Sequence, residues 1–217
     1  MMAAMAEAFQ GMLWGVADMA GHPLAGEYPS AVAVAAPHAS ALTLADYQQA
    51  RMTELIDGAK ARVEAALDRV EALAQARGVA CWRPPLSQRS ESELRAPVSF
   101  KEAAVRAGLG WRGHSDLLVT PQYGPRVRLG LILLGERLPA GEPVTRSGCP
   151  EGCRACVRAC PYGAIIGPRW QPGQPRETRI HIHQCNDNRS AYRHALGRKH
   201  SCGLCMAACP FGSRRGV

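Results

Sequence analysis

The sequence contains no run of about 18 apolar residues, which argues against a membrane-spanning helix. Residues 1–14 contain Glu7 and no basic region, so a secretory signal peptide is not expected. Charged residues make up only 20% of the chain and apolar residues 47%, which excludes wholesale disorder and allows a buried core. These absences predict a cytoplasmic, globular protein, and 217 residues suffice for one domain with a small appended module.

Common signatures of nucleotide-binding and hydrolytic enzymes are also absent. No Walker loop, Ser–His–Asp series or pair of catalytic carboxylates is recognisable in the sequence. Gly108, Gly110 and Gly113 fit the pattern G-x-G-x-x-G, but a dinucleotide fingerprint follows a strand and opens a helix. Here the pattern follows a predicted helix and precedes a predicted strand. It therefore indicates a turn in which the backbone can approach a large ligand closely.

Cysteine, by contrast, is abundant, and eight of the nine cysteines lie between Cys149 and Cys209. In a chain without an export signal, such a group binds metal more often than it forms disulfides. The pattern C-x2-C-x3-C-P occurs twice, over residues 153–161 and 202–210, and an aromatic residue and a glycine follow each copy. Two such arrays are typical of ferredoxins with two 4Fe–4S clusters.

The spacing also predicts how eight thiolates divide between two clusters, because the last cysteine of each array ligates the other cluster in such ferredoxins. The predicted ligands of the first cluster are Cys149, Cys153, Cys156 and Cys209. Those of the second cluster are Cys160, Cys185, Cys202 and Cys205. Two zinc sites or a disulfide framework are the alternatives. Cys81 lies outside the arrays and is interpreted as a buried structural thiol.

The charge of the chain is unevenly distributed. Residues 150–217 contain 11 Lys and Arg but three Asp and Glu, whereas residues 1–149 contain 15 of each kind. The net charge of +8 therefore lies in the cysteine-rich third of the chain. A basic segment is typical of proteins that bind nucleic acid. Two clusters of about −2 each would reduce the excess to about +4, so part of it can balance buried anions.

Hydrophobic periodicity predicts a mixed α and β domain before the arrays. Strands are predicted at residues 14–18, 31–35 and 127–134, and the last, being the most apolar, is expected to be central. A long helix is predicted from Thr43 to Gly78, with Gly58 as an interruption, and a short helix is predicted after Ser99. The fold class is α+β, with one domain at residues 1–145 and a ferredoxin-like module with two 4Fe–4S clusters at residues 146–217.

A family resemblance lies in the glycine-tryptophan loop, residues 107–124, with the sequence Ala-Gly-Leu-Gly-Trp-Arg-Gly-His-Ser-Asp-Leu-Leu-Val-Thr-Pro-Gln-Tyr-Gly. Together with the two cysteine arrays, this loop resembles the epoxyqueuosine reductases and, more remotely, the corrinoid reductive dehalogenases. The resemblance is good over residues 98–212 and faint before them, at the segments that begin at Trp14 and Tyr28.

The resemblance implies a nitroreductase-like, corrinoid-binding domain in which a base-off cobalamin receives electrons through the clusters. The residues implied to line the corrinoid are Gly108, Gly110, Trp111, Gly113, His114, Ser115, Leu117 and Tyr123. In epoxyqueuosine reductases the reduced cobalamin removes an epoxide oxygen from a modified tRNA nucleoside.

The sequence departs from the family pattern at two positions. The catalytic acid of the family lies in an Asp-Thr-x-Pro-Val segment, and Leu94 stands at the corresponding position here. Glu91 or Glu93 could replace the acid only through a shift of the loop. The lysine that usually follows Trp-x-Gly is His114. No catalytic residue is therefore assigned.

Three functions remain as hypotheses. The first is an oxidoreductase that delivers low-potential electrons to cobalamin or another large cofactor at residues 108–123. The second is an electron-transfer or assembly partner without a substrate of its own. The third is an epoxyqueuosine reductase acting on tRNA. An electron donor of ferredoxin, flavodoxin or reductase type is expected as a partner, a membrane is not, and a homodimer would complete the core of a shortened domain.

Overall fold

The computed structural model describes residues 1–85, 94–191, 199 and 201–213. The chain folds as two compact units, and each unit is built from three segments. The first unit contains Met1–Pro37, Ala59–Gly110 and Val127–Val144. The second unit contains His38–Gly58, Trp111–Arg126 and Thr145–Val217. A functional boundary between residues 145 and 146 stays a prediction.

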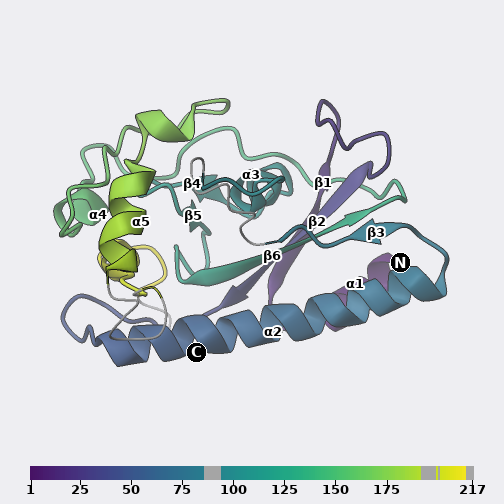
Figure 1. The fold of residues 1–217 in the computed structure, drawn as a ribbon, viewed down its shortest axis with the longest axis horizontal. Helices are drawn as coiled ribbons and strands as arrows, with labels where there is room; N and C mark the ends of the chain where they lie inside the picture. Colours follow the sequence, from purple (N-terminus) through teal and green to yellow (C-terminus); the bar gives the residue numbers. More distant parts are fainter. Residues whose placement is uncertain (86–93, 192–198, 200, 214–217) are drawn as a thin grey trace. The chain divides into compact units, whose positions relative to one another are not determined.

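The first unit contains a four-stranded antiparallel sheet in the order β1-β2-β6-β3 (Figure 1). Its strands are β1 (Leu13–Asp18), β2 (Ser30–Pro37), β3 (Cys81–Trp82) and β6 (Val127–Leu134). The three strand predictions are confirmed in position. β6 pairs with β2 on one side and β3 on the other, so the expected central place of this apolar segment is also confirmed.

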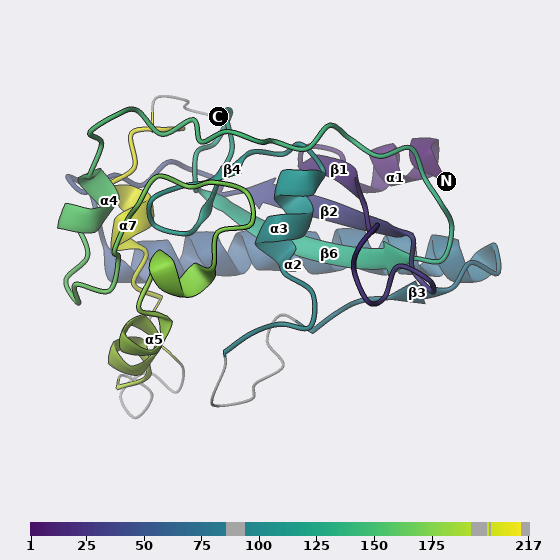
Figure 2. The same ribbon diagram turned by 90° about the horizontal axis from the view of Figure 1, so that it is seen from above.

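Two helices cover opposite faces of this sheet (Figures 1 and 2). They are α2 (Gln49–Ala76), whose residues from Ala59 onward belong to this unit, and α3 (Phe100–Arg106); a further helix, α1 (Met2–Ala8), lies at the N-terminus. Val63, Leu67 and Val70 of α2 pack into one core with Val34 and Ile132 of the sheet. Both faces of β2 are therefore covered, which explains why all eight of its residues are buried.

The helix boundaries in the structure test the capping and interruption signals predicted from the sequence. The Ser99 Oγ accepts a hydrogen bond from the Glu102 amide at 3.2 Å, so the predicted cap of α3 is confirmed. The prediction that α2 begins at Thr43 is wrong, because the Thr43 amide and hydroxyl donate to Asp46 within a loop and the helix begins at Gln49. The interruption expected at Gly58 is also wrong, since α2 is continuous there.

Gly130 lies where α2 approaches β6 closely. A Cβ at this position would lie 2.3 Å from the Val63 Cγ1 and 2.9 Å from the Leu67 Cδ1. We expect Gly130→Ala to lower the free energy of unfolding by about 1–3 kcal/mol in chemical denaturation, because the core would be overpacked. The control is Gly58→Ala in α2, where nothing lies within 4 Å of the new Cβ, and helix propensity should raise stability by about 1 kcal/mol. Equal effects of the two substitutions would contradict this close packing.

The second unit contains the cysteine arrays and a two-stranded sheet of β4 (Trp111–Arg112) and β5 (Leu118–Val119). Its other elements are α4 (Ala155–Arg158), the 3-10 helix η1 (Arg176–Thr178), α5 (Ile182–Ser190) and α7 (Leu204–Ala207). α4 and α7 occupy the same position within the two arrays, each beginning two residues after the first cysteine of the pattern, and they pack against each other. The sequence repeat is thus a structural repeat.

No helix in the described part of the chain is long and apolar enough to cross a membrane.

Candidate iron–sulfur site

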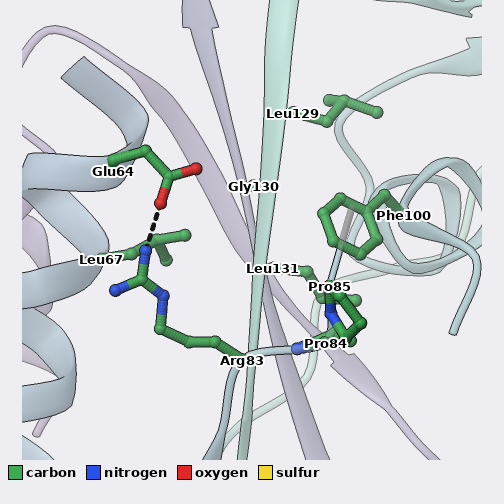
Figure 3. Close-up of a pocket in the computed structure, with 9 residues that line it drawn as sticks. All are labelled: Glu64, Leu67, Arg83, Pro84, Pro85, Phe100, Leu129, Gly130 and Leu131. Carbon is green, nitrogen blue, oxygen red and sulfur yellow. Dashed lines mark hydrogen bonds and ion pairs between the residues drawn. The ribbon is translucent and has the colours of Figure 1, made fainter. Parts of the chain in front are cut away.

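A cavity in the first unit lies beside β6 and contains none of the predicted site residues (Figure 3). Glu64 and Arg83 form an ion pair in its wall, and the Arg83 guanidinium also contacts Asp68 and, at 3.2 Å, Glu71 beyond the lining residues. The remaining lining residues are mainly apolar: Leu67, Pro84, Pro85, Phe100, Leu129, Gly130 and Leu131. Because this cavity offers no thiol, the candidate site lies in the second unit.

A cavity in the second unit is lined by four cysteine side chains, which we call the first thiol set. They are Cys149, Cys153, Cys156 and Cys209. The set combines three cysteines at the first array with the last cysteine of the second array, as the sequence predicts for one cluster. Cys149 and Cys156 are buried, and the other two are partly exposed. The structure brings the four thiols together, while their role as ligands stays a prediction.

The other four predicted ligands, which we call the second thiol set, are Cys160, Cys185, Cys202 and Cys205. They lie close enough that the charge of one affects the pKa of another. Burial raises the pKa of Cys205 to about 12, and the neighbouring thiolates that raise it further are Cys202, Cys156, Cys185 and Cys160. Burial also raises the pKa of Cys185, and Cys160 and Cys202 add to this effect while Arg189 opposes it. Cys156 belongs to the first thiol set, so the two sets are neighbours.

The chemistry of these thiols suits a metal cluster that displaces protons. Burial raises the pKa of Cys156 to about 11, and the thiolates of Cys209, Cys149 and Cys153 add to the effect. The metal-free thiol is therefore neutral at pH 7, and ligation must release its proton. Among the residues that the structure describes, no three Cys, His, Asp or Glu side chains gather closely enough to hold a single metal ion. Four cysteines are the ligand number of a 4Fe–4S cluster.

The glycine-tryptophan loop forms part of the wall of the same cavity. Gly113, His114 and Ser115 line it beside the first thiol set. The Trp111 indole Nε1–H donates a hydrogen bond to the Cys149 Sγ at 3.4 Å. A Cβ on Gly113 would lie 2.7 Å from the Val119 Cγ2, so glycine allows the loop to pack closely against β5. Residues implied by family resemblance to line a corrinoid thus also contact the thiols, which the sequence did not indicate.

The remaining residues of the predicted corrinoid site are divided between the two units. In the first unit, Gly108 has a φ of +80° and ends α3 in a Schellman motif, with the Gly108 amide bound to the Val105 carbonyl and the Leu109 amide to the Ala104 carbonyl. Gly110 follows in the same unit. In the second unit, the Leu117 carbonyl accepts from the Gly113 amide at 2.9 Å, and the backbone of Tyr123 lies against Gly212. Corrinoid binding by these residues stays a prediction.

A buried charge network fixes the loop that follows Trp111. The Asp116 carboxylate, 2% exposed, accepts hydrogen bonds from the Arg112 Nε at 3.0 Å and the Arg179 Nε at 3.1 Å. Arg179 is fully buried and also donates to the Gly113 carbonyl. Burial lowers the pKa of Arg179, and Asp116 opposes this effect. Asp116 has a φ of +63°, an uncommon conformation for a residue other than glycine, so the network holds the backbone as well as the charges.

His114, which stands where the family usually has a lysine, makes a structural contact within the second unit. Its Nδ1 lies 2.8 Å from the Gly167 carbonyl oxygen and 3.1 Å from that of Pro168. Carbonyl oxygens only accept hydrogen bonds, so Nδ1 carries the proton. The ring therefore ties the glycine-tryptophan loop to the segment between the two arrays.

The second array is anchored on the segment 38–58 of the same unit. Met52 and Leu55 pack against Ala207 of α7. The Tyr47 hydroxyl donates to the Cys202 carbonyl, and burial raises the pKa of Tyr47 to about 12. These contacts position an array from residues about 150 positions earlier in the chain, a separation at which the sequence contains no local signal.

Two further predictions concern residues away from the arrays. Leu94, at the position of the family acid, has a φ of +50°, and Glu91 and Glu93 lie outside the described residues. Cys81 lies in β3 opposite Leu134 and is partly exposed, so the prediction that it is buried is wrong.

The four-thiol cavity and the repeated arrays define an iron–sulfur protein. Residues 149–212 match the family model described as "4Fe-4S double cluster binding domain", so the chain contains a 4Fe–4S cluster-binding domain.

Sequence comparison shows that the chain is similar to epoxyqueuosine reductases. It is 34% identical over 116 residues to that of Listeria monocytogenes, which covers 52% of this chain and 30% of the relative. It is 32% identical over 117 residues to that of Salmonella typhimurium, which covers 54% of this chain and 30% of the relative. The predicted resemblance is confirmed, although the match spans less than a third of the length of these curated relatives.

Solved structures show the same fold. An epoxyqueuosine reductase bound to an epoxyqueuosine-modified tRNA stem loop matches with a TM-score of 0.58 and 19% identity, covering 88% of this chain and 50% of that one. The catabolic reductive dehalogenase NpRdhA matches with a TM-score of 0.60 and 18% identity, covering 94% of this chain and 30% of that one. The mixed α and β fold is thereby confirmed, together with the more remote resemblance to reductive dehalogenases.

Proposed function

We propose that this chain is an iron–sulfur oxidoreductase that holds two 4Fe–4S clusters and passes low-potential electrons to a cobalamin or another large cofactor at residues 108–123. The observation that carries the proposal is the first thiol set, in which cysteines of both arrays surround one cavity walled by the glycine-tryptophan loop. The names of the relatives support reductive chemistry, and one similar structure is described as a B12-dependent dehalogenase.

The residues present fit such clusters. The first cluster would be held by Cys149, Cys153, Cys156 and Cys209, and the second by Cys160, Cys185, Cys202 and Cys205. Clusters bound there would supply one-electron reduction. The chain itself contributes burial of the sulfurs, and the Trp111 N–H donates to the Cys149 sulfur. A hydrogen bond to a ligand sulfur favours the more negative, reduced state and so raises the reduction potential.

Metal analysis after anaerobic reconstitution tests the cluster part of the proposal. We expect about eight iron and about eight sulfide per chain, as two four-iron clusters require. On reduction with dithionite, EPR signals of 4Fe–4S(1+) should appear. Zinc without sulfide in protein purified under the same conditions would contradict the proposal.

Cobalamin titration of the cluster-loaded protein tests the cofactor part. We expect the cobalt(II) EPR spectrum of a base-off corrinoid at one equivalent per chain. A spectrum of free cobalamin beside intact cluster signals would remove the corrinoid from the proposal and leave the clusters in place.

An electron-transfer or assembly partner is a second candidate function. Leu94 at the position of the family acid favours it, because a leucine cannot donate a proton to a substrate. The glycine-tryptophan loop also already contacts the thiols. In this case the protein should exchange electrons with a ferredoxin or flavodoxin and show no saturable turnover on its own.

Epoxyqueuosine reduction on tRNA is a third candidate. The names of the relatives, the tRNA stem loop in one similar structure and the basic last third of the chain support it. Its test is tRNA binding that weakens steeply with salt.

A cytoplasmic location and a homodimer also stay predictions.

A further inference from the structure

Arg126 is a buried cation beside the second array. The residue is 3% exposed and lies two positions after the end of the glycine-tryptophan loop. Its guanidinium donates to four main-chain carbonyl oxygens of the second unit. They are those of Phe211 at 2.6 Å, Cys209 at 3.0 Å, Ala207 at 3.1 Å and Leu42 at 3.2 Å. Three of these acceptors lie at the end of the second array.

The carbonyl acceptors satisfy the hydrogen bonds of Arg126 but do not cancel its charge. A buried charge usually has a partner of opposite sign, because the loss of hydration is otherwise costly. Asp46 attracts the guanidinium, but from a side chain exposed to solvent, where water screens the attraction. The Arg126 guanidinium also donates to the main-chain carbonyl of Cys209 at 3.0 Å, and the Cys209 thiol lines the cavity of the first thiol set. The buried charge of Arg126 therefore lies beside a residue of the first thiol set.

We propose that Arg126 is the fixed countercharge of the cluster held by the first thiol set and raises the reduction potential of that cluster. The inference rests on the proposed function, since it needs a cluster at this site. One-electron reduction adds a negative charge to the cluster, and a nearby fixed positive charge stabilises the reduced state more than the oxidised state. Little water lies between the two charges to screen them, because Arg126 is buried.

Charge and hydrogen bonding can be separated by two substitutions at this position. Arg126→Gln keeps a donor amide and removes the charge. Arg126→Lys keeps the charge and loses the planar fork that reaches several carbonyls. A merely structural role would make both variants fail alike, whereas a countercharge makes only the glutamine variant change the potential.

Potentiometric titration of the reconstituted protein, followed by EPR, measures the effect. In Arg126→Gln we expect the equilibrium constant for reduction to fall tenfold or more, a midpoint potential at least about 59 mV more negative. Arg126→Lys should remain near the native midpoint. The matched control is Arg51→Gln, at an arginine that is 49% exposed and paired with Glu54, where no change is expected. The affected cluster is the one whose signal is absent in Cys209→Ala.

An unchanged midpoint in Arg126→Gln with full iron content would overturn the inference while leaving the clusters established. If this variant takes up no cluster, Asp46→Asn decides, because it removes the opposing charge and keeps an oxygen for the Thr43 hydrogen bonds. The midpoint potential of Asp46→Asn should then be more positive than that of the native protein. An unchanged or more negative midpoint would overturn the inference in that case. Native protein without iron and sulfide would instead contradict the proposed function.

Discussion

Cys209→Ala is expected to remove one of two clusters, so that iron falls from about eight to about four per chain. The physical reason is that Cys209 supplies a thiol to the cavity of the first thiol set, whereas Cys202 and Cys205 of the same array belong to the second set. Iron and sulfide analysis of the reconstituted variant measures the loss. Cys81→Ala, outside both sets, is the matched control and should keep all the iron.

Paired substitutions test the interleaving of the arrays directly. Cys149→Ala with Cys209→Ala should lose no more iron than either change alone, because both residues serve one cluster. Cys149→Ala with Cys160→Ala should lose both clusters, although these residues lie only 11 positions apart in the sequence. The reverse pattern would show that each array holds its own cluster and that the assignment of Cys160 and Cys209 is wrong.

Asp116→Asn is expected to lower the free energy of unfolding by about 3–5 kcal/mol, the usual cost of removing one partner from a buried ion pair. The carboxylate is the shared acceptor of Arg112 and Arg179, which are 9% and 0% exposed. Without its charge, two guanidinium groups would remain buried beside each other. Asparagine tolerates the positive φ of this position, so the substitution tests the charge and not the backbone.

Chemical denaturation of the metal-free protein measures this change without interference from the cluster. The matched control is Asp18→Asn, at an exposed ion pair whose Arg137 Nη1 lies 3.6 Å from the Asp18 Oδ1. The same substitution there should cost about 0–1 kcal/mol. A loss at Asp116 no larger than at Asp18 would mean that the buried network does not stabilise the second unit.

The repeated array is the feature that the sequence predicted best. Ligand spacing is local, so C-x2-C-x3-C-P indicates a cluster-binding turn wherever the chain carries it, and the match of residues 149–212 to a 4Fe–4S family model agrees. The three strands were predicted for the same reason, because alternation and apolar runs act over a few residues. The beginning of α2 was not predicted correctly. The Thr43 amide and hydroxyl donate to Asp46 within a loop, and the sequence of this loop only resembles a helix cap.

Arg126, Asp116 and Arg179 were not identified from the sequence. Each is an ordinary charged residue in its local context, and each acquires its role from a partner more than 60 positions away. Trp111 was predicted as a residue of a corrinoid site, but its contact with Cys149, 38 positions away, was not predicted; this contact places the loop beside the thiols.

The sequence by itself therefore determined which reactive groups this protein carries, namely thiols in two repeated arrays and a glycine-tryptophan loop, because these depend on residue type and short spacing. Only the tertiary structure decided which side chains surround that chemistry. Burial removes water from Arg126, Asp116 and Arg179, and burial is a property of the packed chain. With water removed, their charges act strongly on their neighbours, which no short stretch of sequence reveals.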